Sequence, residues 1–228
     1  METGKAGEKE AAPKVIIGVE ELPLGIVHVK FSSQEALAKT FLRFEEHFES
    51  PHFRGKVFTF DEFKAWYAAR RGVFDYYEEW DGFNIPSKAL KDFYEGKFNP
   101  LSAEEKEFLE LFKDRREKFY IIGTVGDDST DTFKHEAAHA LFYLDKQYRR
   151  EVLKVMAKLR SKELNEHLLN ELSYHRAVLE DERHAYLLAE LGYLESEGFD
   201  VSKFREVHEK LSDLYNKFSP FQHHAKGR

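Results

Sequence analysis

Two histidines and a glutamate in one short run have the spacing of a metal-binding helix. The run HEAAH contains His135, Glu136 and His139. On an α-helix, residues four apart lie on one face about one turn from each other, so both imidazoles can bind the same Zn²⁺ ion. Glu136 lies about 100° round the helix from His135, where its carboxylate can take a proton from a metal-bound water. The run therefore predicts a zinc site with an adjacent general base.

A zinc ion that performs hydrolysis usually has three protein ligands and one water, so a third ligand is needed. The downstream run LEDERHAY contains three consecutive acids, Glu180, Asp181 and Glu182. On a helix they point about 100° apart, so at most one of them faces the core. Glu182 shares its helix face with a mostly apolar set of residues, His175, Val178, Leu179, Ala185, Tyr186 and Ala189. An acid on an apolar face is costly to bury unless a cation compensates its charge, so Glu182 is the expected third ligand.

Two other interpretations of these acids remain open. Glu180 is the second choice as ligand, if the helix turns its neighbouring face to the core. Alternatively, all three acids form a solvated face that pairs with Arg176 and Arg183, as charged runs on helices usually do.

Asp145 is a further candidate, because it lies six residues after His139. In zinc enzymes of the metzincin type, a ligand at this spacing is reached through a glycine turn. Phe142 occupies the position of that glycine. If the helix continues, Asp145 lies a full turn or more beyond the metal, so we expect it to contribute least.

Hydrolysis also needs a hydrogen-bond donor for the negative charge that develops on the substrate oxygen. Tyr174, His175 and Tyr186 lie on or near the segment that carries Glu182. We name His175 and Tyr186 as candidate catalytic donors. Asp181 is a candidate partner for a ligand imidazole. Packing in the core is the alternative role for each of these side chains.

The HEAAH run follows a strand-forming run and a polar turn, and this order resembles the zincin metallopeptidases. Glu182 is followed three residues later by Ala185, which resembles the gluzincin group of that superfamily. The resemblance covers about residues 118–188. It implies a zincin-like active-site helix, a zinc cofactor, and hydrolysis of a peptide or protein substrate by water that Glu136 activates. The alternatives are a catalytically silent zinc-binding module with a binding or regulatory role, and a helical interaction protein without metal.

The composition limits the class of protein. The 228 residues contain no cysteine, so any metal must be bound by His, Asp and Glu. The net charge is −7 without a basic block, which argues against nucleic-acid binding, and no apolar run is long enough to cross a membrane. No export signal is apparent near the start, so we expect a cytoplasmic location. Abundant Glu and Lys favour a thermophilic protein, and nothing indicates the oligomeric state.

The pattern of apolar residues predicts strands in the first part of the chain and helices in the second. Strands are expected over 14–19, 25–31, 57–60 and 118–125, with an ordered aromatic loop over 76–86. Helices are expected over 33–48, 61–70, 87–94, 102–112, 131–144, 146–159, 162–172, 174–196 and 201–217. Ser33, Asp61 and Ser102 are the expected N-caps.

This order of elements favours an α+β fold, with a small sheet packed on a mainly helical body. The expected parts are a disordered tail over 1–13, an α+β part over 14–117, a zincin-like helical catalytic part over 118–220 and a polar tail over 221–228. The boundary near residue 117 is soft, so one continuous domain is the alternative.

Overall fold

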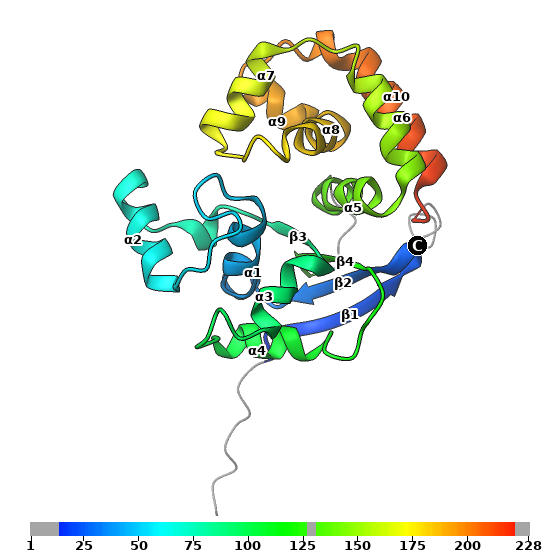
Figure 1. Cartoon of the computed structure of the whole chain (residues 1–228). Helices are drawn as coiled ribbons and strands as arrows, with labels where there is room; N and C mark the ends of the chain where they lie inside the picture. The colour runs from blue at the N-terminus through cyan, green and yellow to red at the C-terminus, as the bar shows by residue number, and fades with distance from the viewer. Residues whose placement is uncertain (1–13, 127–130, 222–228) are drawn as a thin grey trace, which may run out of the picture.

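The computed structural model describes residues 14–126 and 131–221 and confirms the α+β class. A four-stranded sheet lies between two groups of helices (Figure 1). Its strands are β1 (Ile16–Leu22), β2 (Ile26–Phe31), β3 (Gly82–Pro86) and β4 (Tyr120–Val125), in the order β1-β2-β4-β3. β2 and β4 are parallel, whereas β1 and β3 run antiparallel to their neighbours. The two edges of the sheet are therefore β1 and β3.

Alternate strand residues face two separate apolar cores, because successive side chains of a strand point to opposite faces. On β4, Ile121 belongs to the core around helix α1, whereas Tyr120 and Ile122 belong to the core around helix α5. On β3, Phe83 and Ile85 belong to the α1 core. The sheet is thus covered on both faces, and the pleat decides which helix layer each residue meets.

The first layer is built on α1 (Gln34–Glu49), which packs against β3 and β4. Ser33 is its N-cap, as predicted, because its Oγ accepts a hydrogen bond from the backbone N–H of Ala36. A side chain at Gly123 of β4 would collide with the ring of Phe41, so the glycine lets α1 lie close to the sheet. This close packing fixes the position of the C-terminal half of α1, which carries three glutamates.

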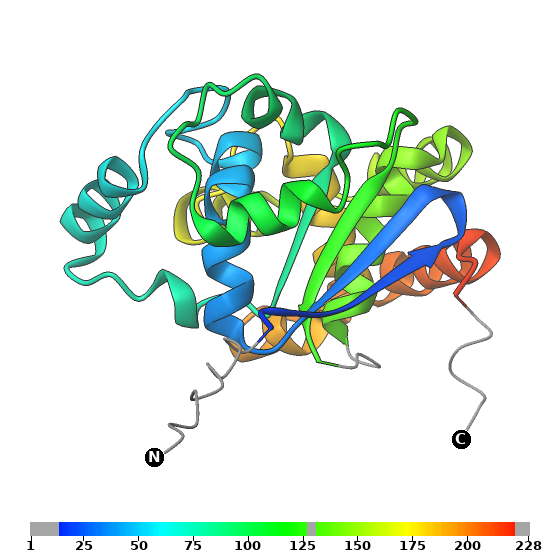
Figure 2. The ribbon, with the colours of Figure 1, turned by 90° about the horizontal axis from the view of Figure 1, so that it is seen from below.

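Three shorter helices complete the first layer: α2 (Phe60–Arg71), α3 (Lys91–Tyr94) and α4 (Ala103–Glu110). Thr59 and Glu62 form a capping box at the start of α2, so the N-cap predicted at Asp61 lies two residues earlier. Ser102 and Glu105 form the predicted capping box of α4. Figure 2 shows α2 on the side of the molecule away from the β1–β2 hairpin.

The second layer is built on α5 (Asp131–Leu144), which packs against β3 and β4. Its other helices are α6 (Lys146–Met156), α7 (Lys162–Glu166), α8 (Leu179–Ala189), α9 (Leu191–Ser196) and α10 (Arg205–Phe218). α8 packs along α5, and α6 and α10 lie side by side next to them (Figure 1). Within the described ranges, no helix has both the length and the apolar character needed to span a membrane.

Several elements differ from the sequence prediction. Residues 82–86 form β3 inside the expected loop, because pairing with β4 supplies backbone hydrogen bonds that a short run cannot form alone. The strand predicted over 57–60 is wrong, since residues 57–59 have no regular structure and α2 begins at residue 60. The helix predicted over 174–196 starts only at Leu179, after Ser173 with a φ of 60°, and breaks again at Glu190.

Both terminal tails predicted from the sequence lie outside the described residues, apart from Phe221. The structure describes the chain from residue 14 to residue 221, with a gap over 127–130. Within that part, β4 pairs with β2 on one side and with β3 on the other. The strand just before the HEAAH helix is therefore an inner strand of the sheet.

Candidate metal centre

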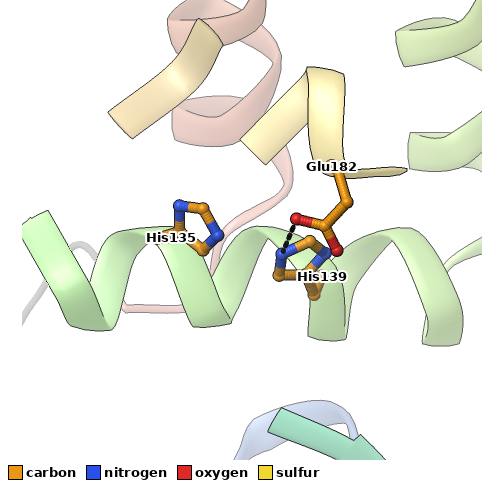
Figure 3. Close-up of side chains that lie close together, drawn as sticks. All are labelled: His135, His139 and Glu182. Atoms are coloured by element: carbon orange, nitrogen blue, oxygen red, sulfur yellow. Dashed lines mark ion pairs between the residues drawn. The ribbon is translucent and has the colours of Figure 1, made fainter. Parts of the chain in front are cut away.

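His135, His139 and Glu182 converge between α5 and α8 (Figure 3). The two imidazole centroids are 4.9 Å apart, and the side chains of His139 and Glu182 are almost completely buried. Oε2 of Glu182 lies 3.7 Å from Nε2 of His139. One potential ligand atom from each of the three residues lies within 4.8 Å of the other two. The structure therefore brings together the three residues that the sequence predicts as metal ligands.

Small side chains and helix polarity explain why the three residues can meet. Ala137, Ala138 and Ala140 are buried, and they let α5 lie close to the sheet and to α8. On α8, the acids Glu180, Asp181 and Glu182 occupy the first turn. Acidic side chains stabilise a helix N-terminus, because the free backbone N–H groups there carry partial positive charge. The start of α8 thus favours acids, and the packing turns Glu182 inward.

Each histidine has a carboxylate beside its Nδ1 atom. Nδ1 of His139 lies 3.0 Å from Oδ1 of Asp181, and Nδ1 of His135 lies 3.5 Å from Oε1 of Glu190. Carboxylates in this position orient an imidazole and leave Nε2 available for a metal. Burial alone lowers the pKa of His139, but Asp181 and Glu182 outweigh it and raise that pKa well above its usual value.

The buried atoms of this group fit a divalent cation. Oε2 of Glu182 is buried and, among the residues that the structure describes, has no hydrogen-bond donor. Burial raises the pKa of Glu182 well above its usual value. A buried carboxylate that accepts no hydrogen bond is costly, and a cation bound between the three side chains would compensate its charge. Two imidazoles and one carboxylate are a common ligand set for catalytic Zn²⁺.

Glu136, the predicted general base, points from α5 toward strand β3. Its Oε2 accepts a hydrogen bond of 2.6 Å from Nδ2 of Asn84. The side chain is only 6% exposed, yet it contributes to the wall of the same cleft as the two histidines. Glu136 therefore lies beside the predicted ligands with its carboxylate already held by one donor.

A cleft with a volume of about 720 Å³ leads to the three predicted ligands. Its walls come from α1, α2, the start of β3, α5, the segment 170–174 and α8. This volume is in the range of pockets that hold small molecules or several residues of a peptide. The predicted metal site therefore lies at the wall of a space large enough for a substrate.

The cleft is strongly acidic. Among the described residues that line it, nine are Asp or Glu and two are arginines, and one of these, Arg71, forms an ion pair with Glu79. Three of the acids, Glu45, Glu46 and Glu49, come from α1. Burial raises the pKa values of Glu46 and Glu49 to about 7 and the pKa of Glu45 well above its usual value. Once the pH exceeds these raised pKa values, the excess of acidic groups gives the cleft a negative potential.

Family models, curated proteins and solved structures gave no match to this chain. The resemblance to the zincins therefore stays a prediction from the HEAAH run, Glu182 and the order of elements in the sequence. No relative supplies a substrate or a role for any side chain.

The two predicted donors have different surroundings. Tyr186 lines the cleft, its ring lies 5.1 Å from that of His135, and its hydroxyl is 3.3 Å from the hydroxyl of Tyr174, which also lines the cleft. His175 lies before the start of α8 and does not line the cleft. Its Nδ1 accepts a hydrogen bond from the backbone N–H of Ala177. The tyrosine pair therefore fits a donor role by position, whereas His175 does not.

The two alternative ligands have other partners. Glu180 is half exposed and forms an ion pair of 2.9 Å with Arg183. Asp145 is the N-cap of α6, where its Oδ1 accepts hydrogen bonds from the backbone N–H groups of Gln147 and Tyr148. Neither acid belongs to the group that contains the two histidines. Of the three candidates, only Glu182 therefore lies beside both histidines.

Several residues of the site are absent from the sequence prediction. Asn84 contacts Glu136 from a segment expected to be a loop, and its only signal is a polar residue within the apolar run FNIP. Glu190 approaches His135 from the end of α8. The acids of α1 come from a helix far away in sequence, and no spacing rule connects them to HEAAH. Tertiary packing alone brings these groups to the cleft.

Proposed function

We propose that this protein is a zinc-dependent hydrolase that cleaves peptide bonds. The observation that carries the proposal is Glu182, a buried carboxylate that faces His135 and His139 at the wall of a cleft. Within the described part of the chain, its Oε2 has no hydrogen-bond donor. This arrangement is what a catalytic zinc site requires of the protein, namely three ligands and access for a substrate.

The residues of the chain have separate tasks in this proposal. When bound, zinc would supply a Lewis acid that polarises a carbonyl group and acidifies water. His135, His139 and Glu182 would hold the ion, while Asp181 and Glu190 orient the imidazoles. Glu136 takes a proton from water and later gives it to the amine that leaves.

In this proposal, Tyr186 and Tyr174 stabilise the negative charge that develops on the substrate oxygen. Tyr186 lies beside His135, and its hydroxyl is within 3.3 Å of the Tyr174 hydroxyl. A hydroxyl that donates to the developing oxyanion stabilises the transition state more than the ground state. We assign this donation to Tyr186, with Tyr174 as the neighbour that orients its hydroxyl.

A structural zinc module is less well supported, because a structural zinc site has four protein ligands. Among the described residues, no fourth His, Asp or Glu places a ligand atom within 4.8 Å of those of His135, His139 and Glu182 together. Nδ1 of His175 is engaged by the backbone N–H of Ala177, and this side chain does not line the cleft, so its position does not suit a fourth ligand. A set of three ligands favours hydrolysis over a structural role.

The direct test is incubation of zinc-loaded protein with a mixed peptide library, followed by mass spectrometry of the products. We expect cleavage that stops with a zinc chelator and returns when zinc is added. Glu136→Gln should bind the same amount of zinc and lose at least about 10³-fold in kcat/KM, because proton transfer is removed while the ligands remain. Absence of chelator-sensitive cleavage across the library would rule out the proposed activity.

A further inference from the structure

We propose that Asn84 is a positioning residue that holds the carboxylate of Glu136 in one orientation. Its Nδ2 donates a hydrogen bond of 2.6 Å to Oε2 of Glu136, and both side chains are only 6% exposed. The contact itself is independent of the activity. Its catalytic consequence, an oriented general base, rests on the proposed function.

The position of Asn84 follows from the pleat of β3. Phe83 and Ile85 face the α1 core, so the alternating residues Gly82 and Asn84 face α5. β3 pairs in an antiparallel register with β4, in which Asn84 lies opposite Ile122. β4 is an inner strand that pairs on both sides, so this register fixes where Asn84 lies along α5, the helix that carries Glu136.

A second hydrogen bond fixes the direction of the Asn84 amide. The hydroxyl of Tyr120, on β4, donates to Oδ1 of Asn84. A carboxylate accepts hydrogen bonds and an amide nitrogen donates them, so Nδ2 must face Glu136 when Oδ1 receives the tyrosine proton. Tyr120 is only 2% exposed, which leaves its ring little freedom to move. The order Tyr120, Asn84, Glu136 is therefore a directed chain from the sheet to the predicted base.

Gly82 lies close to Oε1, the other oxygen of the same carboxylate. A Cβ atom at residue 82 would lie 2.6 Å from Oε1 of Glu136 and 2.7 Å from Cγ2 of Thr132. Carbon atoms do not approach oxygen or carbon that closely without a shift of the chain. The absence of a side chain at Gly82 thus leaves room for Oε1, while Asn84 binds Oε2. One short edge strand determines the position of both carboxylate oxygens.

This arrangement restricts the base without competing for its proton. An amide N–H group donates to the carboxylate, and it is not itself ionisable. The hydrogen bond from Asn84 and the close approach of Gly82 reduce the number of side-chain conformations that Glu136 can adopt. A base held in the productive orientation avoids the loss in rate that follows from a misplaced group.

The kinetic test uses zinc-loaded protein and a peptide that the parent chain cleaves. We expect Asn84→Ala to lower kcat by about 10- to 100-fold and to change KM by less than about twofold, because substrate contacts remain while the base is free to move. Asn84→Asp, which keeps the shape but cannot donate to a carboxylate, should lose at least as much. Zinc content and the visible spectrum of the cobalt-substituted variants should match the parent.

Tyr120→Phe is the milder second variant, because it removes one oxygen and keeps the buried ring. It should reduce kcat in the same direction and by less than Asn84→Ala, since the amide can still reach Glu136. A rise in KM with unchanged kcat, or a changed cobalt spectrum, would overturn the positioning role. Either result would show that these side chains act on the substrate or on the metal ligands instead.

A double-mutant cycle tests the contact without any activity assay. Urea unfolding of the metal-free full chain gives the fold-increase in the unfolding equilibrium constant that Asn84→Ala causes. We expect this fold-increase to be at least about five times larger in the parent than in the Glu136→Ala variant, where the hydrogen-bond partner is already absent. The matched control is the exposed Glu35→Ala background, in which the effect of Asn84→Ala should equal its effect in the parent. Equal effects in the parent and in Glu136→Ala would overturn the proposal. If coupling is present and no chelator-sensitive hydrolysis is found, the contact stands and only the proposed function fails.

Discussion

Oδ1 of Asp181 lies 3.0 Å from Nδ1 of His139, on the side of the imidazole opposite to Glu182. Two neighbouring residues of α8 thus approach both nitrogen atoms of one histidine. Asp181 is 24% exposed, whereas Glu182 is 1% exposed, so the inner acid faces the predicted metal and the outer acid orients the ring. The first turn of α8 therefore carries a predicted ligand and the partner of another ligand.

Asp181→Asn should weaken zinc binding by about 10- to 100-fold, because the neutral amide stabilises the orientation and basicity of His139 less than a carboxylate does. Competition with a chromogenic zinc chelator measures this affinity. The matched control is Glu180→Gln, one residue away and directed to Arg183, which should leave the affinity unchanged. Equal affinities for parent and Asp181→Asn would remove Asp181 from the site.

Glu182→Gln should have opposite effects on the metal-free and the zinc-loaded protein. Without metal, the variant should unfold at the same or a higher temperature than the parent, because a buried carboxylate without a donor is replaced by a neutral amide. With zinc, the stabilisation should largely disappear, because stabilisation by a ligand depends on its affinity. Thermal unfolding with chelator and with excess zinc measures both effects. A variant that zinc stabilises as much as the parent would contradict the ligand role.

Tyr186→Phe should lower kcat by about 10²-fold with little change in zinc content, because one donor to the developing oxyanion is removed. Steady-state kinetics on a peptide cleaved by the parent measures the change. His175→Ala is the control from the same segment, and we expect parent-like kinetics, since that side chain lies outside the cleft lining. The reverse pattern would assign the donor role to His175.

The metal-free protein should become less stable as the pH rises from about 4.5 to about 7, in part because of Glu46. Burial raises the pKa of this carboxyl from 4.5 to about 7 in the folded chain. In that window the folded state binds more protons than the unfolded state, so each extra proton lowers the unfolding free energy by up to about 1.4 kcal/mol per pH unit.

Glu46→Gln should flatten this pH dependence, because the neutral amide does not titrate. Urea unfolding at several pH values with chelator present gives the comparison. Glu35→Gln, an exposed change on the same helix, should keep the parental slope. A parental slope in Glu46→Gln as well would show that other groups account for the pH dependence.

The acidic cleft should favour cationic peptides over anionic ones. At low salt and at a pH above the raised pKa values of Glu46 and Glu49, we expect kcat/KM to be about tenfold or more higher for a peptide with lysine near the cleaved bond than for its glutamate counterpart. Salt should reduce the difference, because it screens charge. Glu49→Gln in the cleft should narrow the preference, whereas the exposed Glu110→Gln outside it should not. A preference for the anionic peptide would contradict this account of the cleft.

The sequence by itself determined the local features of the site. The spacing of His135 and His139 fixes their common face, because helix geometry depends only on neighbours in the chain. An acid within an apolar stripe identified Glu182, because burial of a charge needs compensation. The N-caps at Ser33 and Ser102 could also be predicted, because a capping side chain bonds to a residue only three positions away.

Only the tertiary structure decided which distant groups meet these residues. Asn84 reaches Glu136 across a strand pairing, and the acids of α1 reach the cleft through the packing of α1 on the sheet. Neither contact leaves a periodic pattern in the sequence, because its energy comes from partners dozens of residues away. The sequence predicts a loop at β3, because its five residues are too few to give a strand pattern. The strand forms because pairing with β4 supplies hydrogen-bond partners for its backbone.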